Sequence, residues 1–122
     1  MSLNRYNTKR DKNEKQIIQT LTAFGLSVFS LDVPVDLLLC FRGVTFLAEV
    51  KDGPKATFTP SQIKFLRDWG GDVFVLNSNE AALELVKQLR RGDASEALLE
   101  SKRIIAAAIS RHDRLAIKRG QR

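Results

Sequence analysis

The segment VPVDLLLCFRGVTFLAEVK, residues 33–51, decides the fold of this chain. It holds two largely apolar runs separated by Arg42 and Gly43, a pair typical of a tight turn. The segment therefore predicts a hairpin of two strands, over residues 35–41 and 44–51. Strands this apolar are expected to be buried, so a charged residue inside them needs an oppositely charged partner or a functional role.

Three charged residues interrupt these strands. The even positions of the second strand form a continuous apolar face, made of Val44, Phe46, Ala48 and Val50. Glu49 and Lys51 are two residues apart and share the opposite face. Asp36 begins the partner strand, so the hairpin brings it to the same end of the sheet as Glu49. Two carboxylates and one ammonium group are therefore expected to converge there.

Two interpretations of this cluster are open from the spacing alone. Two neighbouring carboxylates repel each other, and a divalent cation removes that repulsion. Oxygen ligands without a Cys/His set suit Mg²⁺ or Mn²⁺ rather than zinc. The structural alternative is an ordinary salt bridge between Glu49 and Lys51, with Asp36 capping the turn after Pro34.

The rest of the chain predicts helices around a small sheet. Helical spacing ends at Gly25, and Thr59-Pro60 is a helix start whose apolar residues, from Ile63 to Trp69, suit a core stripe. The expected elements are a helix over 11–24, a strand over 26–31, the hairpin, a helix over 60–69, a strand over 73–76, and helices over 80–90 and 95–118. This order is typical of an α/β domain with a small mixed sheet flanked by helices. We expect a flexible basic arm over 1–10, one domain over 11–91, and a basic helical extension over 92–122.

The net charge of +6 lies at the two ends of the chain. Residues 1–15 and residues 93–122 each sum to +3, whereas residues 16–92 sum to zero. A neutral body with basic ends suits a polyanion such as nucleic acid, and solvated tails are the alternative. The single cysteine, Cys40, excludes an internal disulfide framework and a multi-cysteine zinc site. Without a signal-like or membrane-spanning segment, the expected location is the cytoplasm.

The segment from Pro34 through Asp36 to Glu49-Val50-Lys51 resembles the signature of the PD-(D/E)XK nucleases, an acid after a proline turn, a hairpin, and an acid-x-lysine triplet. The residues from Thr59 to Gln62, the helix to Trp69, Gly70-Gly71 and the strand over 73–76 resemble the small VRR-NUC branch of that superfamily. That branch includes stand-alone bacteriophage versions and is related to Holliday-junction resolvases. The resemblance covers residues 5–88 and implies a restriction-endonuclease-like core of order α-β-β-β-α-β-α, plus the extra C-terminal helix.

The resemblance also implies roles for individual residues. It implies that Asp36, Glu49 and the Val50 backbone carbonyl bind Mg²⁺ or Mn²⁺, that Lys51 acts on the attacking water, and that Glu14 completes the site. Gln62 matches a glutamine of the family that lies close to the site. An equal alternative is that Gln62 only helps the Thr59 cap of its helix. One departure is that Val35 separates Pro34 from the aspartate. Asp32 could take its place, although the Leu-Leu-Leu strand favours Asp36.

The expected function is metal-dependent hydrolysis of DNA phosphodiester bonds by direct attack of an activated water. Family relatives imply a homodimer acting on branched or junction DNA without sequence readout, with RNA not excluded, in a bacterial or phage-infected cell. Phosphate contacts are expected from five basic residues: Lys9, Arg10, Arg42, Lys55 and Lys64. For Arg42, Lys55 and Lys64, surface solubility is an equal alternative. The alternative from another class is a non-catalytic nucleic-acid-binding or assembly module that has kept the fold.

Overall fold

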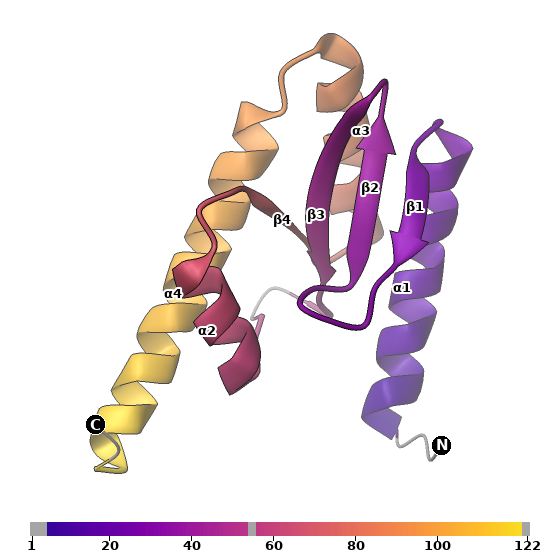
Figure 1. Cartoon of the computed structure of the whole chain (residues 1–122). Helices are drawn as coiled ribbons and strands as arrows, with labels where there is room; N and C mark the ends of the chain where they lie inside the picture. The colour runs from indigo at the N-terminus through magenta and orange to yellow at the C-terminus, as the bar shows by residue number, and fades with distance from the viewer. Residues whose placement is uncertain (1–4, 54–55, 121–122) are drawn as a thin grey trace.

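A four-stranded sheet with helices on one face and along one edge makes up the fold (Figure 1). The computed structural model describes residues 5–53 and 56–120, with side chains from residue 12 onward. In chain order the elements are α1 (Arg5–Ala23), β1 (Ser27–Ser30), β2 (Leu37–Phe41), β3 (Val44–Val50), α2 (Pro60–Asp68), β4 (Val73–Leu76), α3 (Asn79–Arg91) and α4 (Ser95–Lys118). The α/β prediction is confirmed. The main difference is that α1 begins at Arg5 rather than at residue 11, since neither Gly nor Pro interrupts the polar residues before it.

The sheet is mixed, with strand order β1-β2-β3-β4. β1, β2 and β3 pair antiparallel, whereas β3 and β4 pair parallel, so the connection between them must cross over and carries α2. The β2–β3 turn has positive φ at Arg42 (50°) and Gly43 (82°), the backbone signs of a type I′ turn. The predicted hairpin is therefore present, with its tip at Arg42.

α1 and α3 cover one face of the sheet, and both lie behind it in Figure 1. The core beneath them consists of aliphatic side chains from both layers: Ile17, Leu21, Leu37, Leu39, Ala48, Val50, Leu76 and Leu85. Gly25 ends α1 with φ of 94°. Its N–H donates to the Thr22 carbonyl at 3.0 Å, and the Leu26 N–H donates to the Leu21 carbonyl at 3.1 Å. This Schellman motif packs Leu26 against the end of α1 and turns the chain directly into β1.

α4 lies along β4, the strand at the edge of the sheet. The buried Ser101 hydroxyl accepts the Val75 N–H at 2.9 Å, which satisfies a backbone donor on that edge. The Ala97 N–H donates to the buried Gln88 side chain at 2.8 Å and joins α4 to α3. The first half of α4 therefore belongs to the folded body. Within residues 5–53 and 56–120, none of the helices is long and apolar enough to cross a membrane.

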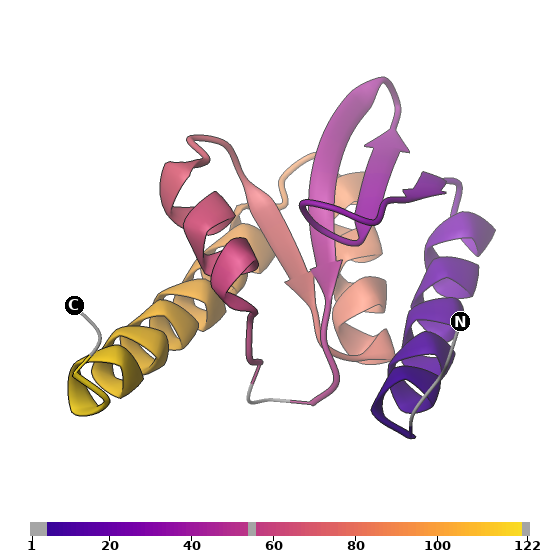
Figure 2. The same ribbon diagram turned by 60° about the horizontal axis from the view of Figure 1, so that its bottom comes forward.

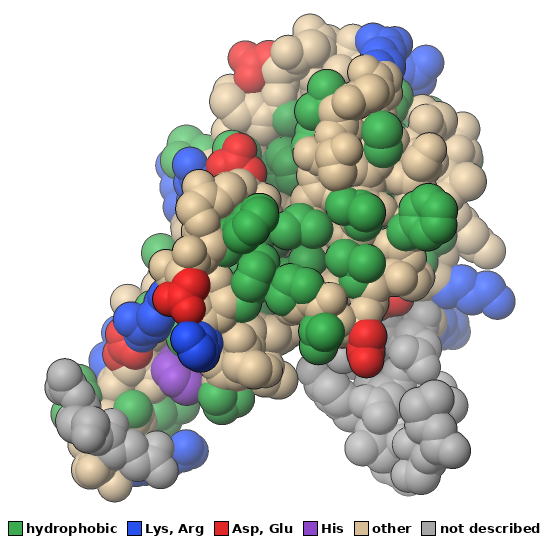
Figure 3. All heavy atoms as spheres, in the orientation of Figure 1, with side chains coloured by type: hydrophobic (Ala, Val, Ile, Leu, Met, Phe, Trp, Pro, Cys, Tyr) green, Lys and Arg blue, Asp and Glu red, His purple; other side chains and the backbone are tan. Residues whose placement is uncertain are grey.

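The other sheet face, here called the open face, carries an apolar row across all four strands. Strand register aligns Phe29, Leu38, Leu47 and Val73. Figure 3 shows hydrophobic side chains gathered over the strands on this side. Phe29 is 68% exposed. The predicted core stripe on α2 is wrong in part, because only Ile63 of the helix is buried and Trp69, the C-cap residue, is 46% exposed. Val44 is also exposed, at the hairpin tip.

Candidate active site

Asp36 and Glu49 lie side by side where β2 begins and β3 ends. The Asp36 N–H donates to Glu49 Oε1 at 3.0 Å, and the Val50 N–H donates to Asp36 Oδ2 at 2.8 Å. Each carboxylate therefore accepts a backbone donor from the strand of the other, which fixes both in place. Asp36 is 4% exposed and Glu49 is fully buried, whereas Asp32 is exposed. The structure thus brings Asp36, and not Asp32, to Glu49.

Lys51 and Gln62 complete a hydrogen-bonded cluster around Glu49. Glu49 Oε2 receives the Lys51 ammonium at 3.0 Å and the Gln62 amide at 2.6 Å. Lys51 Nζ also donates to Gln62 Oε1 at 3.2 Å. Every buried side-chain polar atom that the structure describes has a hydrogen-bond partner. The carboxylate, ammonium and amide therefore form a closed network, a rigid arrangement when all of its members are satisfied.

Gln62 also caps the helix that carries it. The Thr59 side chain accepts the Gln62 N–H at 3.2 Å, and Gln62 Oε1 accepts the Thr59 N–H at 3.1 Å, which forms a capping box with Pro60 at the first turn. The two interpretations of Gln62 are therefore compatible. The same side chain closes the N-terminus of α2 and contacts both Glu49 and Lys51.

Two residues near Lys51 were missed by the sequence reasoning. Asn13 Nδ2 donates to the Lys51 carbonyl at 2.9 Å, and the Phe58 ring lies 4.4 Å from Lys51 Nζ. An ammonium at this distance from a ring face is attracted to it electrostatically. Asn13 precedes the buried Ile17 by four residues, so its place on the inner side of α1 could have been found from helical spacing. For Phe58, the available signal in the sequence was an aromatic residue in an otherwise polar loop.

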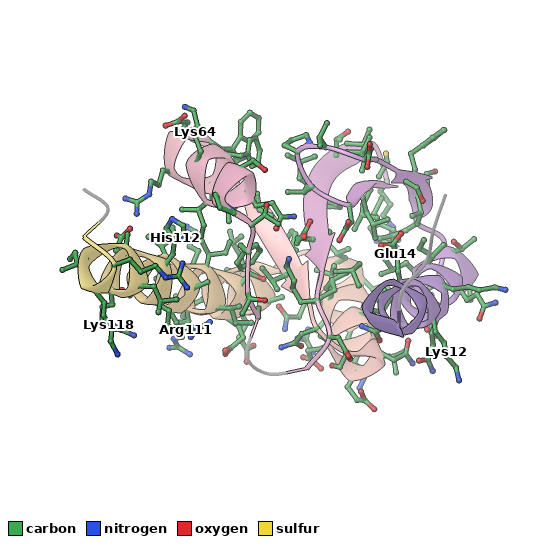
Figure 4. All side chains as sticks on the ribbon, turned by 90° about the horizontal axis from the view of Figure 1, so that it is seen from below. Lys12, Glu14, Lys64, Arg111, His112 and Lys118 are labelled. Atoms are coloured by element: carbon green, nitrogen blue, oxygen red, sulfur yellow. The ribbon has the colours of Figure 1, made fainter. Side chains whose placement is uncertain are left out.

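Glu14 lies on the inner side of α1, three residues before Ile17, and it is half-buried. In Figure 4 it lies on the side of α1 nearer the sheet, away from Lys12. Within the described residues, no three His, Cys, Asp or Glu side chains are close enough together to hold a metal ion. The structure therefore brings Asp36 and Glu49 together without adding Glu14 as a third acid.

Burial raises the pKa of Glu49 above its ordinary value of 4.5, and the neighbouring charge of Asp36 raises it further. Lys51 and the Gln62 hydrogen bond lower that pKa without reversing the shift. The Lys51 ammonium therefore balances the negative charge of ionised Glu49 only in part. Such a site favours an additional positive charge.

The predicted phosphate contacts do not all lie near the carboxylates. Arg42 is at the hairpin tip, over the Phe41 ring, and therefore at the opposite end of β2 from Asp36. Lys64 is exposed on α2 and pairs with Asp68 at 3.0 Å. Lys55 and the side chains of Lys9 and Arg10 lie outside the described part of the chain. α1 and α4 flank the end of the sheet that holds Asp36 and Glu49 (Figures 2 and 4).

The chain is similar to a solved structure described as a VRR_NUC domain. The two share 27% sequence identity with a TM-score of 0.52, over 65% of this chain and 95% of that one. No family model matches the sequence, and no curated protein matches it. The similarity agrees with the α-β-β-β-α-β-α order of the elements before α4. The chain therefore contains a VRR-NUC-like, nuclease-type domain with the restriction-endonuclease-like fold of the PD-(D/E)XK superfamily.

Proposed function

We propose that this protein is an endonuclease that hydrolyses DNA phosphodiester bonds with Mg²⁺ or Mn²⁺ as its cofactor. The observation that carries the proposal is the closed cluster of Asp36, Glu49, Lys51 and Gln62. It lies at one end of a sheet whose fold is VRR-NUC-like. A fold alone does not specify an activity, and the geometry of the site therefore carries the functional argument.

The residues present fit a hard divalent cation. Two adjacent buried carboxylates supply oxygen ligands, and burial together with the charge of Asp36 raises the pKa of Glu49 despite the Lys51 ammonium beside it. In the proposed site Asp36, Glu49 and the Val50 carbonyl would hold the cation, and Glu14 would act from α1 without being one of its ligands. A divalent cation supplies polarisation of a phosphate oxygen and a lower pKa for water.

The side chains of the cluster have separate tasks in this proposal. Lys51 orients the attacking water and stabilises the negative charge that develops on the phosphate oxygens. Gln62 holds Lys51 and Glu49 at a fixed separation through its two hydrogen bonds. Water attacks phosphorus, the bond from phosphorus to the leaving oxygen breaks, and that oxygen takes up a proton. In this proposal the attack on phosphorus is direct, and no covalent intermediate with the protein forms.

The basic ends of the chain support a nucleic-acid substrate. α1 and α4 flank the site, and each end of the chain carries a net charge of +3. Contacts to the phosphate backbone do not read base sequence, so affinity should fall steeply with salt. We propose a preference for branched or junction DNA over intact duplex, in the cytoplasm of a bacterial or phage-infected cell.

We also propose that two copies associate through the open face. Its apolar row ends at the highly exposed Phe29, and the exposed Trp69 stacks on Phe65 at 5.5 Å nearby. Aromatic side chains of about 150–250 Å² each are costly to leave in water. A two-fold pairing would bury the same patch on both copies. Sedimentation of wild type against Phe29→Asp tests this, and an unchanged molecular mass would argue against this interface.

The decisive experiment compares substrates and variants under the same conditions. Four-way junction DNA, linear duplex and RNA of matched length are incubated with Mg²⁺ or Mn²⁺ and with wild type, Asp36→Asn or Lys51→Met. Cleavage of DNA by wild type, at least about 100-fold faster than by either variant, supports the proposal. Binding of DNA without cleavage under either metal would instead favour the non-catalytic binding module. Cleavage by Lys51→Met at the wild-type rate would show that the active site lies elsewhere.

A further inference from the structure

We propose that Arg111 of α4 is a positioning residue for the active-site cluster. It holds the segment that leads into α2, so that Phe58 and Gln62 reach Lys51 and Glu49. This inference rests on the proposed nuclease function and adds a residue from the C-terminal helix to it. Arg111 itself contacts none of the four residues of the cluster in the interactions described above.

The contact is a hydrogen bond from a charged donor to a backbone carbonyl. The Arg111 guanidinium donates to the Ala56 carbonyl oxygen at 2.6 Å, across 55 residues of sequence. Ala56 is 2% exposed, although its neighbour Thr57 is exposed. The loop therefore has a fixed point at Ala56, with its methyl group buried and its carbonyl held by α4. Bonds from charged donors are about twice as strong as neutral ones.

The residues just after Ala56 depend on that fixed point. Phe58, two residues later, places its ring against the Lys51 ammonium. Thr59 is the N-cap of α2, and Gln62 in the first turn bonds to Glu49 and Lys51. A movement of Ala56 by about 1 Å is carried into these contacts, because only three short backbone steps separate it from the cap. Misplacement of this size can lower a rate by about 100-fold.

α2 needs such an anchor because its own packing is slight. The helix has nine residues, and only Ile63 among them is buried. A second polar link to α4 is the ion pair of Arg67 with Asp113, and both side chains are half-exposed. Exposed ion pairs contribute little to fixing a structure. The partly buried bond from Arg111 is therefore the stronger of these two polar links between α4 and the segment 56–68.

A second explanation for Arg111 is that it is one more cation that binds phosphate. The two explanations differ in the kinetic constant that they change. A lost phosphate contact weakens DNA binding and raises KM, whereas a displaced Lys51 and Gln62 lower kcat with KM retained. Arg114 provides the comparison, because it is exposed one turn further along α4 and its removal changes the net charge equally.

The test measures kcat, KM and amide hydrogen exchange for wild type, Arg111→Ala, Arg111→Lys and Arg114→Ala in the full-length protein. We expect Arg111→Ala to lower kcat by about 10–100-fold at unchanged KM. Exchange at the Thr59 and Gln62 amides should accelerate by about tenfold, and Arg111→Lys, which keeps one donor, should recover most of both effects. Arg114→Ala should leave kcat and these exchange rates at their wild-type values.

Two results would overturn the proposal. One is wild-type exchange at Thr59 and Gln62 in Arg111→Ala. The other is a raised KM with unchanged kcat, equal to the effect of Arg114→Ala, which would make Arg111 a phosphate contact. If the wild type cuts no DNA, the nuclease proposal fails by itself, and the exchange rates still decide whether Arg111 fixes the segment that leads into α2.

Discussion

Replacement of Lys51 by methionine should destabilise the protein as well as inactivate it. The Lys51 side chain is 10% exposed, and its ammonium lies 3.0 Å from an oxygen of the fully buried Glu49. Its loss leaves the buried Glu49 carboxylate beside Asp36 without that ammonium. Removing one member of a buried ion pair costs about 3–5 kcal/mol. In a chain of this size that corresponds to a fall in Tm of roughly 10–30 °C.

The loss of stability should depend on pH in a defined direction. Lys51 lowers the pKa of Glu49, so its removal raises that pKa further. A protonated Glu49 needs no ammonium partner, and the folded variant can take up a proton at low pH. The difference in unfolding free energy between wild type and Lys51→Met should therefore be small near pH 4 and large near pH 8. Added Mg²⁺ should restore part of the stability that Lys51→Met has lost at the higher pH.

The assay is urea unfolding followed by circular dichroism, without metal and then with Mg²⁺. Lys64→Met is the matched control, because that lysine is 81% exposed and its ion pair with Asp68 should contribute less than about 1 kcal/mol. The double variant Lys51→Met/Glu49→Gln removes both charges and should recover most of the lost stability. A loss below about 1 kcal/mol for Lys51→Met near pH 8, or no recovery in the double variant, would refute the reasoning.

Three further predictions concern single contacts. The raised pKa of Glu49 favours its protonated form in the folded state. Metal-free wild type should therefore lose stability as the pH rises from 4.5, the ordinary pKa, through the raised pKa of the folded state. Glu49→Gln should remove this loss in pH-dependent urea titrations. Thr59→Ala deletes half of the capping box and should cost about 1 kcal/mol while slowing DNA cleavage, because the placement of Gln62 depends on it; calorimetry and nicking rates check both effects. Ser101→Ala leaves the Val75 N–H without its acceptor and should cost about 1–3 kcal/mol in the same calorimetric measurement.

The strands and helices were predictable because their signals are local. Apolar runs, the Arg42-Gly43 turn, Gly25 after α1 and the Thr59-Pro60 start each depend on a few neighbouring residues. Alternation along β3 likewise predicted that Glu49 and Lys51 share a face, and the hairpin predicted that Asp36 would join them. These three residues do meet at one end of the sheet.

The contacts that close the site come from distant segments, and local patterns do not contain them. Asn13 reaches the Lys51 carbonyl across 38 residues, and Arg111 reaches Ala56 across 55. The exposure of Trp69 was also unpredictable, because its apolar spacing on α2 says nothing of whether another layer covers the helix. For the same reason the sequence could not locate α4, whose first half covers the edge of β4.

The most direct test of the central claim is the nicking of supercoiled plasmid DNA by wild type and Glu49→Gln. Both should bind the DNA with similar affinity, because Glu49 is buried and does not contribute to the basic surface. Wild type should nick the plasmid with Mg²⁺ or Mn²⁺ and not with EDTA, whereas Glu49→Gln should be slower by at least about 100-fold. Equal nicking by the two proteins, or binding by wild type without nicking in either metal, would contradict the account.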